Sequence, residues 1–220
     1  MGRWVVVSLF AAAAVPMSGR AVDAIGVALA APAPRTALIS VYFVLRAGVV
    51  IAFAVLVLRR PQPRRRSREP LAFAACCVAM LTVLALGGPG IRAPTTLVLV
   101  GDLVAVCACA WLLASVVVLG RCFGVLPEVR GLVTRGPYRV VRHPVYLGEL
   151  GVCVGLVLAA PVAWNAALLG AFAAAQVVRM RLEEATLTAE FPQYERYAAS
   201  TGRLLPRLRK DRLVFHRTVG

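Results

Sequence analysis

The stretch that decides the fold is residues 36–58, TALISVYFVLRAGVVIAFAVLVL, in which the single charged residue is Arg46. A helix rises about 1.5 Å per residue, so about 20 mainly apolar residues cross the ~30 Å hydrocarbon layer of a bilayer. Backbone polar groups must pair internally there, so we expect a transmembrane helix. A charge as deep as Arg46 normally faces the interior of a helix bundle or a watery cavity.

Similar apolar runs fill most of the first 180 residues. Besides 36–58, the predicted spans are residues 4–32, 71–86, 94–119, 144–160 and 161–178. The first is either one interrupted span or two shorter segments, and a cleaved signal peptide is the competing interpretation. The last two are short and read as a helical hairpin that turns at Ala160 and Pro161. The sequence therefore predicts an all-α, multi-span helical membrane protein with about five to six transmembrane helices and a cytoplasmic C-terminal helical segment.

The basic residues cluster between the apolar runs and after the last one, in a chain of net charge +15. Residues 59–68, RRPQPRRRSR, contain six Arg and no acid, so the positive-inside rule places them in the cytoplasm. Two crossings later, the Arg-rich segment 121–142 returns to the same side, so the charge rule and the span count agree. Nucleic-acid binding is the other meaning of such a charge, but little soluble surface remains for it. We expect the bilayer, and no nucleic acid, as a partner.

The six cysteines predict neither a structural disulfide nor a metal site. Most of them lie within apolar runs, where Cys behaves as a small hydrophobic residue. No set of Cys and His residues has the spacing of zinc ligands.

The densest polar segment is residues 136–148, GPYRVVRHPVYLG. Pro144 suits the first turn of a helix, which puts His143 at the helix start, where free backbone N–H groups attract anions. Arg and Tyr are common at head-group level, so an interfacial belt explains those residue types, but less easily their order around His143. Gly148, Gly151 and Gly155 share one face of the helix and predict tight packing against another helix.

A second polar segment, residues 179–184, RMRLEE, ends the last apolar run. Arg179 and Glu183 are four residues apart and share a helix face. A surface ion pair worth a few tenths of a kcal/mol is the simple interpretation. The alternative is that these membrane-boundary carboxylates are occupied by a ligand. The aromatic cluster in residues 191–197, FPQYERY, is explained simply by packing on the membrane domain.

Together these segments resemble the isoprenylcysteine carboxyl methyltransferases and the related phospholipid N-methyltransferases. The resemblance covers about residues 120–208 and rests on Arg-His-Pro-x-Tyr-x-Gly at 142–148, Glu-Glu-x-x-Leu at 183–187, the aromatic cluster and a late Pro206. It implies S-adenosylmethionine as methyl donor, held between the C-terminal helices on the cytoplasmic side of the cell membrane. The implied donor-binding residues are Tyr138, Arg142, His143, Pro144, Tyr146, Leu147, Gly148, Arg179, Glu183, Glu184, Tyr194 and Tyr197.

The chemistry of these side chains suits such a donor. An Arg guanidinium grips a carboxylate as a fork, a Glu accepts from an ammonium or a ribose diol, and a Tyr ring packs against a sulfonium. Methyl transfer is an in-line displacement, so catalysis is mainly positioning. The catalytic candidates are Arg142, His143, Arg179 and Glu183. The two Arg would orient a carboxylate acceptor, which needs no base, whereas His143 or Glu183 would be the base for an amine or hydroxyl acceptor.

We expect one integrated domain, with membrane spans in residues 1–120 and the catalytic region in residues 121–220. The acceptor is expected to be amphiphilic or prenylated and to enter from the bilayer. One alternative is a membrane reductase of the sterol reductase type that uses NADPH. Another is a small transporter or scaffold that uses Arg46 and Asp102 as polar groups inside the membrane. The acceptor, the choice between O- and N-methylation and the oligomeric state stay open at this point.

Overall fold

The computed structural model describes residues 3–59, 65–66, 70–86, 93–122, 128–129 and 131–207. Its α-helices are α1 (Arg3–Ala30), α2 (Pro34–Arg59), α3 (Pro70–Ala85), α4 (Thr95–Leu119), α5 (Pro144–Ala159), α6 (Ala163–Glu190) and α7 (Tyr194–Ser200). The 3₁₀ turns are η1 (Gly120–Cys122) and η2 (Gly136–Arg139), and the short strands β1 (Arg65–Arg66) and β2 (Glu128–Val129) pair antiparallel. Most of the predicted Arg-rich loop 59–68, together with Arg130, lies outside the described residues.

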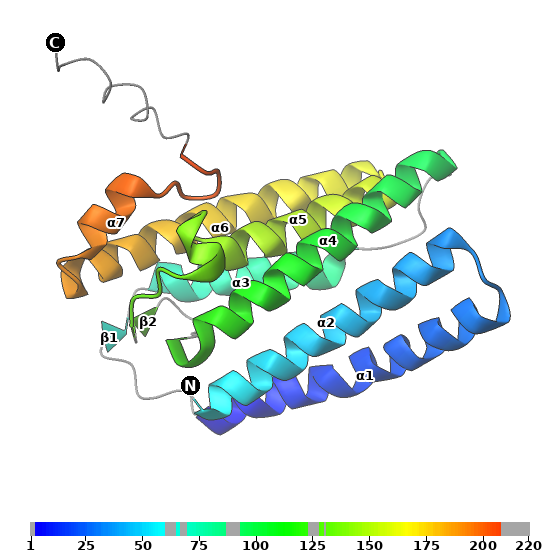
Figure 1. The fold of residues 1–220 in the computed structure, drawn as a ribbon, viewed down its shortest axis with the longest axis horizontal. Helices are drawn as coiled ribbons and strands as arrows, with labels where there is room; N and C mark the ends of the chain where they lie inside the picture. Colours follow the sequence, from blue (N-terminus) through cyan, green and yellow to red (C-terminus); the bar gives the residue numbers. More distant parts are fainter. Residues whose placement is uncertain are drawn as a thin grey trace, which may run out of the picture.

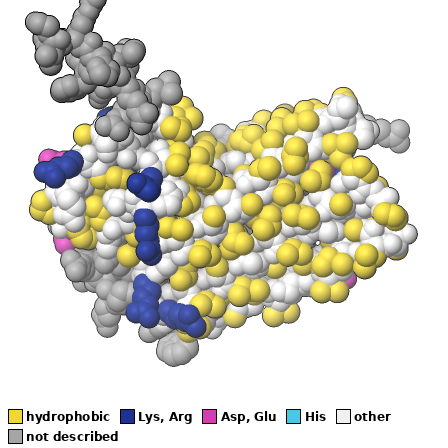
Figure 2. All heavy atoms as spheres, in the orientation of Figure 1, with side chains coloured by type: hydrophobic (Ala, Val, Ile, Leu, Met, Phe, Trp, Pro, Cys, Tyr) yellow, Lys and Arg dark blue, Asp and Glu magenta, His cyan; other side chains and the backbone are white. Residues whose placement is uncertain are grey.

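Three of the described helices are long and apolar enough to cross a membrane: α1 from Phe10 onward, α2 and α4. Helices α3 and α5 are shorter apolar helices, and α6 is long but carries charges in its last third. Large apolar side chains point outward, as at Leu29, which is 80% exposed. Figure 2 shows hydrophobic side chains over most of the visible face, with Lys and Arg gathered at the end where α7 lies in Figure 1. The predicted all-α membrane fold is confirmed.

The helices form a bundle in which α1 packs on α2, α2 on α4, α4 on α5, and α3 on α6 (Figure 1). The first apolar stretch is one continuous helix that runs through Pro16. The predicted hairpin is present, because α5 ends at Ala159 and α6 begins at Ala163. Asn165, which is buried, donates its side-chain N–H to the Ala160 carbonyl at 2.9 Å and so ties this turn together.

Small residues bring α4 and α5 into close contact, as the spacing of the glycines in α5 predicted. A Cβ atom added to Gly148 would lie 2.7 Å from Cβ of Leu112, and one added to Gly155 would lie 2.5 Å from the backbone nitrogen of Ala105. Real Cβ atoms do not approach so closely, so any side chain at Gly155 would push α4 and α5 apart. We call this contact the α4–α5 seam, defined by Gly148, Gly151 and Gly155 against Ala105, Ala108 and Leu112.

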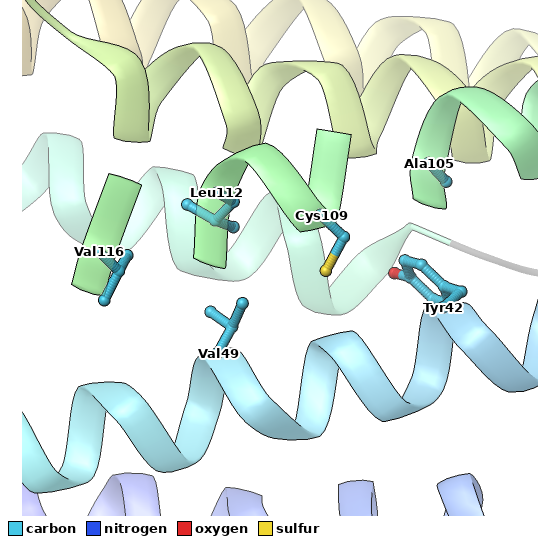
Figure 3. Packing of buried hydrophobic residues seen from close by; sticks show 6 residues of the cluster. All are labelled: Tyr42, Val49, Ala105, Cys109, Leu112 and Val116. Atoms are coloured by element: carbon cyan, nitrogen blue, oxygen red, sulfur yellow. The ribbon is translucent and has the colours of Figure 1, made fainter. Parts of the chain in front are cut away.

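Beside the seam, α4 also faces α2 through an apolar cluster, which shares Ala105 and Leu112 with the seam (Figure 3). Its buried members are Tyr42, Val49, Ala105, Cys109, Leu112 and Val116. Helix α4 is therefore the central element of the bundle, since it packs against both α2 and α5. Two polar chain segments are fixed by this arrangement: the start of α5 and the middle of α2.

Candidate functional site

A cavity of about 370 Å³ extends from the basic end of the bundle into its apolar interior. This volume is in the range of small-molecule sites. At one end, which we call the polar end, the walls are Tyr138, Arg142, His143, Tyr146, Arg179 and Glu183. At the other, the apolar arm, they come from α2, α3, α4 and α5 and include Val49, Phe53, Ala79, Val83, Leu112 and Leu156. The two ends belong to one continuous space.

The start of α5 is held in place from two directions. Trp111 of α4 donates its indole N–H to the Pro144 carbonyl at 3.0 Å. The chain that follows α7 folds back beside it, where the Arg142 backbone N–H donates to the Gly202 carbonyl at 2.8 Å and the His143 N–H donates to the Arg203 carbonyl at 3.1 Å. Pro144 supplies no N–H at the first helical position, as its place at the helix start predicted.

The carboxylate of Glu184 is surrounded by three basic side chains. His143 Nε2 lies 3.0 Å from Oε1 of Glu184, and Arg142 Nη1 lies 3.2 Å from the same oxygen. Arg203 donates to Oε2 from Nε at 2.9 Å and from Nη2 at 2.6 Å, as a fork. Both oxygens are therefore engaged by side chains of the protein itself.

This environment sets the protonation of the pair formed by Glu184 and His143. Burial raises the pKa of Glu184, but hydrogen bonds from His143 and Arg203 and the charge of Arg142 outweigh it and lower the pKa to about 2. Glu184 is then ionised near neutral pH, and a carboxylate only accepts hydrogen bonds, so Nε2 of His143 carries the proton. A base role for His143 would have to use Nδ1.

The neighbouring carboxylate, Glu183, is in a different situation. It lines the cavity, and its Oε2 accepts a hydrogen bond from the Tyr146 hydroxyl at 2.8 Å. Within the described part of the chain its Oε1 has no hydrogen-bond or ion-pair partner. Adjacent residues on α6 therefore present one carboxylate that is satisfied internally and one that is open to a ligand.

Arg179 connects these groups to a polar set deeper in the bundle. Its guanidinium lies 4.8 Å from the centre of the Tyr146 ring, donates to the side-chain oxygen of Gln176 at 2.7 Å and lies 3.5 Å from a carboxylate oxygen of Glu149. Gln176 in turn donates to Glu149. These contacts link α5 to α6. The ring of Tyr146 packs against the Arg179 guanidinium and also lines the cavity.

Three tyrosines complete the polar end. The Tyr197 hydroxyl donates to the Tyr138 carbonyl at 2.6 Å, which attaches α7 to η2. Burial raises the pKa of Tyr197 to about 12, so this hydroxyl keeps its proton near neutral pH. The rings of Tyr194 and Tyr197 meet edge to face with centres 6.0 Å apart. All three line the cavity.

The structure brings most of the sequence-predicted site residues to one wall. Those that line the cavity are Tyr138, Arg142, His143, Pro144, Tyr146, Arg179, Glu183, Tyr194 and Tyr197. Three others lie behind the wall. Gly148 packs in the α4–α5 seam, Leu147 continues the backbone of α5 with its N–H on the His143 carbonyl, and Glu184 is enclosed by its basic partners.

Sequence reasoning missed Arg203, Glu149 and Gln176. Glu149 and Gln176 are polar residues inside apolar runs, and that isolation was a signal for an interior contact. Arg203 gave no signal, because its role depends on the chain folding back after α7. The structure also places Arg46 and Asp102: Arg46 lines the cavity, whereas Asp102 is paired with Arg35, at the start of α2, at 3.3 Å.

This geometry can be compared with known proteins. Residues 91–194 match the phospholipid methyltransferase family. It is a family of integral membrane methyltransferases related to the isoprenylcysteine carboxyl methyltransferases, so the resemblance stated from the sequence is confirmed. The matched segment begins just before α4 and ends at Tyr194, and so it includes both sides of the seam and most of the polar end.

Two curated bacterial proteins are similar to this chain over 78 residues. The cobalt-zinc-cadmium resistance protein CzcN of Cupriavidus metallidurans is 38% identical, and the nickel-cobalt-cadmium resistance protein NccN of Alcaligenes xylosoxydans xylosoxydans is 37% identical. The alignment covers 35% of this chain and 36% and 37% of those proteins. The similarity therefore spans little more than a third of their length.

Proposed function

We propose that this protein is a membrane-embedded methyltransferase that moves a methyl group from S-adenosylmethionine to an amphiphilic acceptor. The observation that carries the proposal is the single cavity with a polar end and an apolar arm, formed largely by the segment that matches the family. The polar end suits the donor and the apolar arm suits the lipid-like part of an acceptor. A carboxylate of the isoprenylcysteine type is the acceptor that the family relationship suggests.

The residues at the polar end fit the donor chemically. Nε of Arg142 and Nε of Arg179 are buried and have no hydrogen-bond partner within the described residues. Buried donors of this kind normally have partners, so they point to an anionic ligand group such as the donor carboxylate. Glu183, with one oxygen open, would accept from an ammonium or a ribose hydroxyl.

When bound, S-adenosylmethionine supplies a methyl group on a sulfonium, which is displaced in line by a nucleophile. The chain contributes position and environment: Tyr146 presents a ring face to a cation, and Tyr138, Tyr194 and Tyr197 exclude water. For a carboxylate acceptor no base is needed, and Arg179 would orient it. For an amine or hydroxyl acceptor we propose Glu183 as the base, because the Nε2 nitrogen of His143 is already committed to Glu184.

The orientation in the membrane is part of the proposal. On the visible face, Lys and Arg side chains gather at the end of the bundle where α7 lies (Figures 1 and 2). The positive-inside rule then puts this end in the cytoplasm, where a water-soluble donor is available. Labelling of single cysteines introduced at Arg139 in intact cells tests this, because reaction with a membrane-impermeant reagent from outside would contradict it.

Equilibrium binding of S-adenosylmethionine to the purified chain in detergent tests the methyltransferase proposal. We expect Glu183→Gln to weaken binding by roughly tenfold or more, because a hydrogen bond to a charged group is lost. Glu195→Gln, on the exposed side of α7, is the matched control and should bind like the wild type. A folded wild type that does not bind the donor contradicts the proposal. Preferential binding of NADPH would favour the reductase instead.

A further inference from the structure

Arg46 is a charged residue in the apolar arm of the cavity, and the methyl-donor site does not use it. It lies in the middle of α2, is half-buried and lines the cavity. Its Nη1 donates to the Tyr42 hydroxyl at 2.8 Å, and its guanidinium lies 5.8 Å from the centre of the Tyr42 ring. Arg46 lines the same cavity as Cys109 of α4 and Cys153 of α5, so it lies on the side of α2 that faces the bundle interior.

The protein provides no anion for this cation within the described residues. The acidic side chains of the helices packed around it have other partners: Asp102 of α4 pairs with Arg35, and Glu149 of α5 accepts from Gln176 and lies beside Arg179. Tyr42 supplies one neutral oxygen, and its hydroxyl reaches from α2 toward Cys109 (Figure 3). A guanidinium at membrane depth with a single neutral partner is expensive unless water or a ligand group reaches it.

The depth of Arg46 shows that it does not belong to the donor site. Tyr42 shares a buried cluster with Ala105 and Cys109 of α4, and Val152 of α5 packs against this cluster, next to the contact of Gly151 with Ala108. Val152 lies eight residues beyond Pro144, which corresponds to about 12 Å along the axis of α5. The polar end lies at the start of that helix. Arg46 therefore lies about two turns of α5 deeper in the cavity than Pro144, beyond Glu149.

We infer that the apolar arm binds an elongated apolar molecule whose buried end carries an anionic oxygen group, held by Arg46 and Tyr42. This inference rests on the proposed function, since that molecule is the methyl acceptor. A plain hydrocarbon tail in the apolar arm would displace water from the Arg46 guanidinium without replacing the lost hydrogen bonds. The acceptor class is thus an amphiphile with two polar groups about 12 Å apart, one near the donor and one at Arg46.

Competition for binding of radiolabelled dodecanoate to the purified chain tests this assignment. The unlabelled competitors are dodecanoate, dodecyl phosphate, dodecanol and dodecylamine, which share one tail and differ in the head group. The experiment is run twice, once with saturating S-adenosylhomocysteine to fill the polar end of the cavity and once without it. We expect both anions to compete roughly tenfold or more better than dodecanol. Their relative strength separates a carboxylate site from a phosphate site.

In Arg46→Gln, the anions and dodecanol should compete with potencies within about twofold of each other. The control is Arg35→Gln, on the same helix and paired with Asp102, which should keep the preference for anions. Arg46→Lys should also keep it, and serves if the Gln variant does not fold. Equal competition by dodecanol in the wild type overturns the inference, as does a preference that survives Arg46→Gln. Failure of S-adenosylhomocysteine to bind would instead count against the methyltransferase proposal. The competition measured without S-adenosylhomocysteine would then still decide the role of Arg46.

Discussion

Glu183 and Glu184 are adjacent on α6, and we predict that neutralising them one at a time has different effects. Glu184→Gln should lower stability, whereas Glu183→Gln should weaken donor binding. Glu184→Gln leaves Arg142, whose side chain is 12% exposed, without a counter-charge, and takes the carboxylate away from His143, whose side chain is 2% exposed. Breaking a buried ion pair from one side costs about 3–5 kcal/mol. Arg203 is half-exposed and contributes less, and a Gln still offers one oxygen, so we expect a loss of about 3 kcal/mol in the free energy of unfolding.

Glu183→Gln should have little effect on stability. It keeps an oxygen for the Tyr146 hydroxyl, and a single hydrogen bond of this kind is worth about 1 kcal/mol. Its effect should fall on the ligand, with donor affinity lowered roughly tenfold or more, because Glu183 lines the cavity and has one carboxylate oxygen without a partner in the described residues.

Both quantities can be measured on the same purified samples in detergent. For a chain of this length, 3 kcal/mol corresponds to a fall of about 6–12 °C in the unfolding temperature, read by intrinsic fluorescence during heating. Donor affinity is read by equilibrium dialysis well below that temperature. The reasoning is refuted if Glu183→Gln lowers the unfolding temperature as much as Glu184→Gln, or if Glu184→Gln weakens donor binding while stability is unchanged.

Three further predictions concern the supporting structure. Gly155→Ala should lower the unfolding temperature because an added Cβ lies 2.5 Å from α4. Gly170→Ala, whose added Cβ has nothing within 4 Å, should be neutral or slightly stabilising, and equal effects of the two variants would contradict the close packing at the α4–α5 seam. Stability should fall as the pH drops from about 4.5 to about 2, since the pKa of Glu184 is lower in the folded state, and Glu184→Gln should flatten that part of the unfolding-temperature profile. Trp111→Phe should cost about 1 kcal/mol, by loss of the hydrogen bond to Pro144, and raise the hydrogen exchange of the first turn of α5; unchanged exchange would argue against this contact as the anchor.

The sequence was a good guide wherever the fold follows from a local pattern. The apolar runs predicted the helices, Ala160 and Pro161 predicted the hairpin turn, and the spacing of Gly148 and Gly155 predicted a close helix contact. It could not show which helix would fill that contact, because many small residues in the earlier runs fit equally well. The partner proved to be α4, through Ala105 and its neighbours.

The candidate site was less predictable because it depends on long-range contacts. The Glu-Glu motif was visible as a pair, but the difference between its members is created by Arg203, which lies beyond α7. Likewise, Arg46 was visible as a charge in a span, but only the packing of α2 on α4 shows that it faces the cavity that also contains Glu183. Residue types suggested the chemistry, and the topology assigned the roles.

Helix α5 explains why stability and function should be coupled in this protein. One of its faces, with Gly148 and Gly155, packs on α4, and the other, with Tyr146, Glu149 and Cys153, lines the cavity. The two faces are nearly opposite at 3.6 residues per turn, so a side chain that widens the seam moves the cavity wall by the same amount. A displacement of about 1 Å is enough to disturb the alignment of reacting groups. Gly155→Ala should therefore weaken methyl transfer by more than its loss of stability accounts for.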